Sequence, residues 1–134
     1  MRPLVAAWAS AAAGLLASCG GSAGDLIALE VSGGFQPQPV RLTVTDDGRG
    51  RCDDGELEPI SSERLIEARE VERELEDLAE EGARFPGGKG AEGRRYVAST
   101  RAGTVRWSGG AATLPEVLPR AALLAEQLED DLCG

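Results

Sequence analysis

An apolar stripe between residues 65 and 78 constrains the fold of this chain more than any other feature. Apolar side chains recur there at three- and four-residue spacing, and the positions between them are mostly charged. This spacing predicts an amphipathic helix, with Ser61 as its N-cap and Gly82 at its end. Such a helix is stable only when its stripe packs against another layer. The stripe consists of Leu65, Ala68, Val71, Leu75 and Leu78.

A second stripe near the C-terminus predicts another amphipathic helix. We expect this helix to start near Pro119, because proline suits the first turn of a helix. The apolar stripes of both helices need another layer of the fold against which they can pack. The apolar side of the second helix is formed by Val117, Ala121, Leu124, Leu128 and Leu132.

Strands are predicted in the segments where apolar and polar residues alternate. Residues 25–31 and 40–45 alternate clearly, and an Asp-Asp-Gly turn then leads into a poorly patterned strand, roughly 49–57. Residues 94–100 and 104–107 predict a hairpin. The candidates for its inner face are Tyr96, Ala98, Val105 and Trp107.

The order of these elements predicts the fold class. Neighbouring strands are joined by short connections, which favours an antiparallel arrangement. We therefore expect a single α+β domain over residues 26–134. Its sheet is mainly antiparallel with about five strands, and both helices pack on one face of that sheet.

Composition argues against several classes of function. The chain has 134 residues, no His and a formal net charge of −9. Such an acidic chain is poorly suited to neutralising phosphates, so we expect no nucleic acid partner. No His can activate a Ser or Cys nucleophile, and the patterns GxSxG and GKS/T are absent, so we expect no catalytic residue. The Asp-Asp-Gly segments at 46–48 and 53–55 do not match an EF-hand calcium loop and are explained by turn chemistry, so we expect no metal site and no separate cofactor.

Charged segments have a structural interpretation. Residues 56–81 carry 11 acidic and 3 basic side chains, and we interpret the acids as a solvated helix face rather than as paired catalytic carboxylates. The segment that follows is basic, and its charges would protect exposed strands from edge pairing. The alternative is a positive patch that faces anionic headgroups or an acidic partner. Its basic residues are Arg84, Lys89, Arg94, Arg95, Arg101 and Arg106.

The first 18 residues predict an export signal. Arg2 precedes an apolar run from Leu4 to Ala17, whose length fits the hydrophobic region of a signal peptide. Leu16-Ala17-Ser18-Cys19 follows directly and resembles the lipobox of bacterial lipoproteins. The resemblance implies that a peptidase cuts before Cys19. It also implies that the Cys19 thiol receives a diacylglyceryl group and that its new amino group is acylated, for example with palmitate.

This motif divides the chain into a signal peptide at residues 1–18, a flexible tether at 19–25 and the folded domain. Two or three acyl chains anchor a protein stably, so we expect an extracytoplasmic protein attached to the lipid bilayer through Cys19. The alternative is ordinary secretion, with Cys19 as a chance thiol.

Two cysteines remain after Cys19. An exported chain meets oxidising conditions, so we expect Cys52 and Cys133 to form a disulfide. A redox-active CxxC pair is absent, and two thiols without His make a poor metal site.

Four segments resemble the emfourin family, small bacterial proteins that include an inhibitor of protealysin, an M4-type metalloprotease. The resemblance covers about residues 26–132 and implies the α+β fold. Members that act as inhibitors need no lipid anchor, and the Cys52/Cys133 pair is not part of the family pattern. The four segments are Val31 to Phe35, Ile60 to Leu65, the hairpin at 94–107, and Leu114 to Pro119.

We therefore expect a lipid-anchored, non-enzymatic protein of the bacterial cell envelope that acts as a binding module. Its partner would be another envelope protein or, as the family resemblance implies, a secreted M4-type metalloprotease that it inhibits. We expect Phe35 to cap the edge of the core. The alternative is that Phe35 fills an apolar pocket of the partner while Pro37 and Pro39 stiffen its loop. The candidate binding loop contains Gly33, Gly34, Phe35, Gln36 and Pro37.

Overall fold

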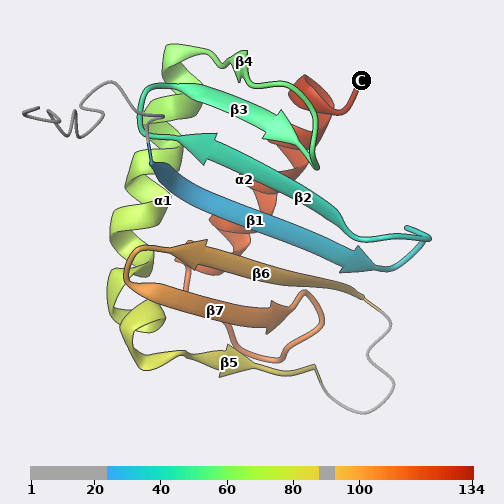
Figure 1. Ribbon diagram of the computed structural model, residues 1–134. Coiled ribbons are helices and arrows are strands. Elements are labelled where there is room, and N and C mark those ends of the chain that lie inside the picture. The colour runs from blue at the N-terminus through green and yellow to red at the C-terminus, as the bar shows by residue number, and fades with distance from the viewer. Residues whose placement is uncertain (1–23, 88–92) are drawn as a thin grey trace, which may run out of the picture.

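A computed structural model describes residues 24–87 and 93–134, which form one mixed sheet with both helices on the same face (Figure 1). The sheet has seven strands in the order β4-β3-β2-β1-β6-β7-β5. The predicted signal peptide and Cys19 lie outside the described residues. The strands are β1 (Asp25–Gly33), β2 (Val40–Thr45), β3 (Arg49–Cys52), β4 (Glu58–Pro59), β5 (Arg84–Phe85), β6 (Arg94–Thr100) and β7 (Gly103–Ser108).

Strand β1 is the middle of the sheet and pairs antiparallel with β2 and β6. Its Leu29 lies opposite Leu42 on one side and Ala98 on the other, so the apolar positions of three strands share one face. The α+β class is confirmed. The β6–β7 hairpin is also as predicted, and the inner-face candidates Tyr96, Ala98, Val105 and Trp107 are all buried.

The predicted sheet of about five antiparallel strands differs from the observed one in two respects. β4 and β5 are additional strands of two residues each, and β5 is parallel to β7. Elements this short show no alternation in sequence. The third strand also ends at Cys52 and does not continue to Leu57, because Asp53 adopts a φ of 51° in the left-handed region.

Helix α1 (Ser62–Glu81) has the predicted ends. The Ser61 hydroxyl accepts a hydrogen bond from the Arg64 backbone N–H at 3.1 Å, as an N-cap does. Gly82 ends the helix with a φ of 62°, which glycine adopts without steric cost. The buried residues of this helix are Ala68, Val71, Leu75 and Ala79.

Helix α2 (Val117–Leu132) starts two residues before the predicted position at Pro119. Proline is tolerated there because backbone N–H groups in the first turn have no partner within the helix. Its apolar side is as predicted, except that Leu132 is only partly buried. The residues of α2 that lie in the core are Val117, Leu118, Ala121, Leu124, Ala125 and Leu128.

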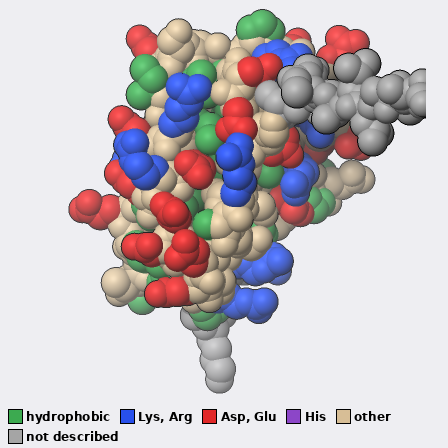
Figure 2. Space-filling model, turned by 60° about the vertical axis from the view of Figure 1, so that its left-hand side comes forward, with side chains coloured by type: hydrophobic (Ala, Val, Ile, Leu, Met, Phe, Trp, Pro, Cys, Tyr) green, Lys and Arg blue, Asp and Glu red, His purple; other side chains and the backbone are tan. Residues whose placement is uncertain are grey.

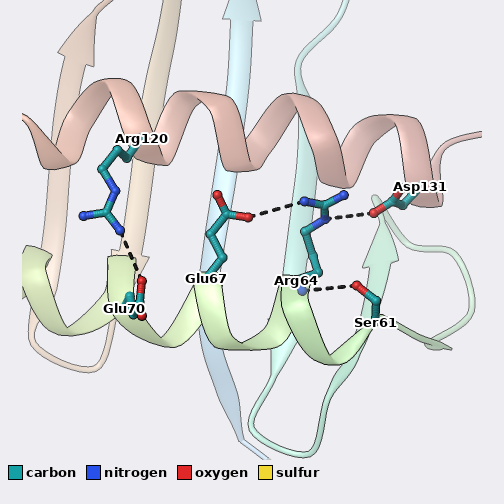
Figure 3. Close-up of polar contacts among 6 residues, drawn as sticks. All are labelled: Ser61, Arg64, Glu67, Glu70, Arg120 and Asp131. Carbon is teal, nitrogen blue, oxygen red and sulfur yellow. Dashed lines mark hydrogen bonds and ion pairs between the residues drawn. The ribbon is translucent and has the colours of Figure 1, made fainter.

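The two helices run antiparallel and are bridged by ion pairs toward both ends (Figure 3). Arg64 of α1 contacts Asp131 of α2 at 3.0 Å, and Arg120 of α2 contacts Glu70 of α1 at 3.4 Å and also Glu74. These side chains are partly exposed, so each pair stabilises the fold by only about 0–1 kcal/mol. Their main effect is to fix how the helices align.

The core fills the space between the sheet and the helices. Gly103, at the start of β7, shows how closely the layers approach: a Cβ atom there would lie 2.2 Å from the Ala79 carbonyl oxygen, and its φ is 146°. Only glycine fits at that position. The largest fully buried side chains include Ile27, Leu29, Leu42, Leu75, Leu118, Leu124 and Leu128.

A disulfide joins Cys52, at the end of β3, to Cys133, at the C-cap of α2. The two Cα atoms are 5.3 Å apart although the residues are 81 positions apart in the sequence. The bond connects the last helix to one side of the sheet. In an unfolded chain it would close a long loop and so restrict the unfolded ensemble.

Cys133→Ser is expected to lower the free energy of unfolding by about 4 kcal/mol, because the long loop is no longer closed in the unfolded state. Urea unfolding of the chain from Gly24 to Gly134 measures the change. Reduced wild-type protein is the control and should match the variant. Two titratable thiols in the denatured, unreduced wild type would contradict the pairing.

Candidate functional site

The loop between β1 and β2 extends beyond one end of the sheet (Figure 1), and Phe35 lies in this loop. The exposed fraction of Phe35 is 105%, the highest among the large apolar side chains that the structure describes as exposed. The expectation that Phe35 caps the core edge is therefore wrong. A large aromatic side chain kept fully in water marks this loop as the candidate functional site.

The loop owes its shape to the two glycines that precede Phe35. Gly33 and Gly34 have φ values of 82° and 63°, in the left-handed region where a side chain is strained. The Gln36 backbone N–H donates to the Gly33 carbonyl oxygen at 3.3 Å and closes a turn with Phe35 inside it. The predicted loop residues from Gly33 to Pro37 therefore form one local structure with Phe35 at its exposed point.

Helix α2 contacts both the loop and the start of β6. The Gln36 side-chain amide donates to Glu129 of α2 at 2.8 Å. One turn earlier, Glu126 contacts Arg94 at the start of β6 at 3.5 Å. A Cβ atom on Gly34 would lie 3.3 Å from Cγ of Arg94, so the Arg94 side chain passes directly beside the loop. Sequence reasoning missed Arg94, Glu126 and Glu129 as supports, because nothing local indicates that α2 reaches this loop.

Gly24, the first described residue, and the Phe35 loop lie at opposite ends of β1. The described chain enters the sheet at Gly24, next to the first residue of β1, and reaches the loop only at Gly33, the last residue. Nine residues of extended strand span roughly 25–30 Å. The length of β1 therefore separates Gly24 from the Phe35 loop.

The acidic residues of α1 are all exposed or partly exposed. Figure 2 brings the α1 side forward and shows acidic and basic side chains interspersed over its surface. Within residues 24–87 and 93–134, no group of three or more possible metal ligands occurs, and neither helix is long and apolar enough to cross a bilayer.

The structure separates the predicted basic segment into two sets. Arg94 and Arg101 form ion pairs with Glu126 and Asp46. Lys89 lies outside the part of the chain that the structure describes. The remaining arginines of the segment point to the side of the sheet away from the helices, namely Arg84, Arg95 and Arg106.

Comparison with known proteins gives no match. No family model matches the chain, and no curated protein or solved structure matches it either. The lipoprotein and emfourin resemblances therefore stay predictions, and any function must be argued from the site itself.

A stacked aromatic pair lies beneath the same end of the sheet. The rings of Tyr96 and Trp107 have centroids 5.2 Å apart and an interplanar angle of 14°. Burial raises the pKa of the Tyr96 hydroxyl above its usual value, and Glu126 adds to this effect while Arg94 opposes it. Tyr96 therefore reports on the cluster that supports the loop.

Tyr96 is the single tyrosine of the chain, so its phenolate absorbance is specific. We expect its titration midpoint in the folded protein to lie above the ordinary value of about 10. The folded state holds this proton more tightly, so the stabilisation is complete below the unfolded pKa and is lost as the pH rises through the folded pKa. Equal midpoints in folded and urea-denatured protein would show that burial has no such effect.

Proposed function

We propose that this protein is a non-enzymatic binding module of the bacterial cell envelope, attached to the membrane through lipidated Cys19, and that Phe35 is its main contact residue. The observation that supports this proposal is the complete exposure of Phe35 on a loop that is closed by a backbone hydrogen bond and bonded to α2 through Gln36. Most other large apolar side chains of the described residues lie in the core.

Phe35 can contribute substantially to binding. Transferring a phenylalanine side chain from water into an apolar pocket is worth about 1.5–3 kcal/mol. The turn at Gly33 and the hydrogen bond from Gln36 to Glu129 already order the loop, so little conformational entropy remains to be lost on association. Pro37 and Pro39 restrict the rest of the loop in the same way.

The position of the loop fits a tethered protein. A tether at residues 19–25 would enter the sheet at the end of β1 that is remote from Phe35. A partner in the surrounding space can therefore reach Phe35 without displacing the anchor. Lipidation would raise the local concentration of the protein at the membrane surface, where it would encounter an envelope partner or a secreted enzyme.

Inhibition of an M4-type metalloprotease is the second candidate function. The same loop favours it, because an exposed aromatic side chain on a stiff, proline-containing segment suits an apolar substrate pocket. In this version Phe35 occupies the pocket and the ordered loop at 33–39 resists being cut.

Photo-cross-linking at position 35 tests the binding proposal. A photoreactive phenylalanine analogue in place of Phe35, in the cells that make the protein, should give a discrete cross-linked product with the partner. Ile66 is the matched control, because it is also apolar and exposed but lies on α1. No product at position 35, or the same product at position 66, would contradict the role of the loop.

A protease assay separates the two candidates. The chain from Gly24 to Gly134 should inhibit a thermolysin-type protease at micromolar concentration if the second candidate is right, and Phe35→Ala should abolish the inhibition. Ile66→Ala should leave it intact. A specific cross-link without any inhibition would favour an envelope partner over a protease.

Cys19→Ala is expected to move the protein from the membrane fraction to the soluble fraction, because the acyl chains have no attachment point. Fractionation of cells followed by mass spectrometry of the N-terminus measures both location and modification. Cys133→Ser is the control for loss of a cysteine and should remain membrane-bound. A wild-type N-terminus without fatty acid would contradict the anchor.

A further inference from the structure

The side of the sheet that faces away from both helices carries arginines from five strands. Figure 1 looks directly onto this side, which we call the open face. Strand register defines it: Glu30 lies opposite Arg41 and Val97, and Thr43 lies opposite Arg51. The five open-face arginines are Arg41 on β2, Arg51 on β3, Arg84 on β5, Arg95 on β6 and Arg106 on β7.

These arginines differ from the others in how their charge is balanced. Among the described residues, the arginines that form ion pairs lie on the helices, in the β6–β7 turn or at the first residue of β3 or β6. None of the five open-face arginines makes an ion pair within that part of the chain. The chain has a net charge of −9, so this face is positive on an otherwise acidic protein.

Three of these arginines line a groove of about 720 Å³. Arg84, Arg95 and Arg106 come from the adjacent strands β5, β6 and β7, and the hydroxyl-bearing residues Ser32 and Ser108 also contribute to the lining. Arg84 and Arg106 lie directly opposite each other in the β5–β7 ladder. Like charges in that position repel, which an anionic occupant would relieve.

We propose that this groove binds an acidic segment of a protein partner. Guanidinium groups donate paired hydrogen bonds to carboxylates, and three of them along one groove fit a run of Asp or Glu side chains. Charge complementarity with an otherwise acidic surface also sets the orientation in which the partner approaches. This proposal rests on the proposed function as a binding module and adds that the segment of the partner in the groove is acidic.

Continuity with the Phe35 loop favours a polypeptide over a phospholipid surface. Ser32, which lines the groove, precedes Gly33 on β1, and Arg95 follows Arg94 on β6. Glu30 also lines the groove, so an acidic segment would place its carboxylates beside the three arginines and away from Glu30. A partner with an apolar pocket beside an acidic segment could occupy both the groove and the loop.

Binding of a fluorescein-labelled octaglutamate peptide tests the proposal. The chain from Gly24 to Gly134 contains every element of the sheet and both helices, and within it Trp107 is the single tryptophan and lines the groove. We expect a rise in peptide anisotropy with a change in Trp107 emission. Replacing Arg84, Arg95 and Arg106 with Gln should weaken binding at least about tenfold, because charge-assisted hydrogen bonds are lost.

Arg73→Gln is the matched control, since Arg73 is an exposed arginine of α1 without an ion pair among the described residues. It should leave peptide affinity unchanged, and thermal unfolding should show that all variants are folded. Equal affinity of the triple variant, or no binding by the wild type, would overturn the proposal.

Vesicles made of equal parts phosphatidylglycerol and phosphatidylcholine form the second arm of the experiment. We expect the chain from Gly24 to Gly134, which lacks Cys19, not to bind them. Vesicle binding that requires the three arginines would show that the open face binds phospholipid, and it would contradict the proposal of a protein partner. The peptide has no apolar side chain, so Phe35→Ala should not affect its binding. If the peptide fails to bind, the proposal for the groove is wrong, but the proposed role of Phe35 is not contradicted.

Discussion

Burial of the apolar face of β1 between its neighbouring strands and the two helices is the interaction on which the rest of the structure depends. Leu29 aligns with Leu42 and Ala98 in a continuous row, and α1 and α2 cover that row. Because both helices lie on the same face, the opposite face of the sheet stays open. The positions of the arginines, the disulfide and the Phe35 loop all follow from this one-sided packing.

The sequence predicted those elements whose signals are local. Ser61 and Gly82 mark the ends of α1 through capping that needs no distant residue. The strand β5 escaped prediction because its two residues pair with β7, about twenty positions further along, and such a short segment has no periodicity of its own. The same reason explains β4.

The candidate site was predictable only in part. The sequence predicted a loop from Gly33 to Pro37, but not the hydrogen bond from Gln36 to Glu129, 93 positions away, that connects this loop to α2. The basic face was predictable in part: Arg84, Arg95 and Arg106 belong to the predicted basic segment, whereas Arg41 and Arg51 come from an earlier part of the chain and join them only through strand order. A set of residues of this kind can be identified once the strand register is known, because the alternation of side chains then assigns each residue to one face of the sheet.

The disulfide also determines what a single backbone cut would do. A cut between Cys52 and Cys133 leaves the two pieces covalently joined. A cut in the Phe35 loop leaves β1, and with it any lipid, unlinked to the remainder. Yet β1 is hydrogen-bonded along both edges, so the severed protein would stay assembled until the sheet itself opened. The rate at which the two pieces separate would then report opening of the sheet and not the cut itself.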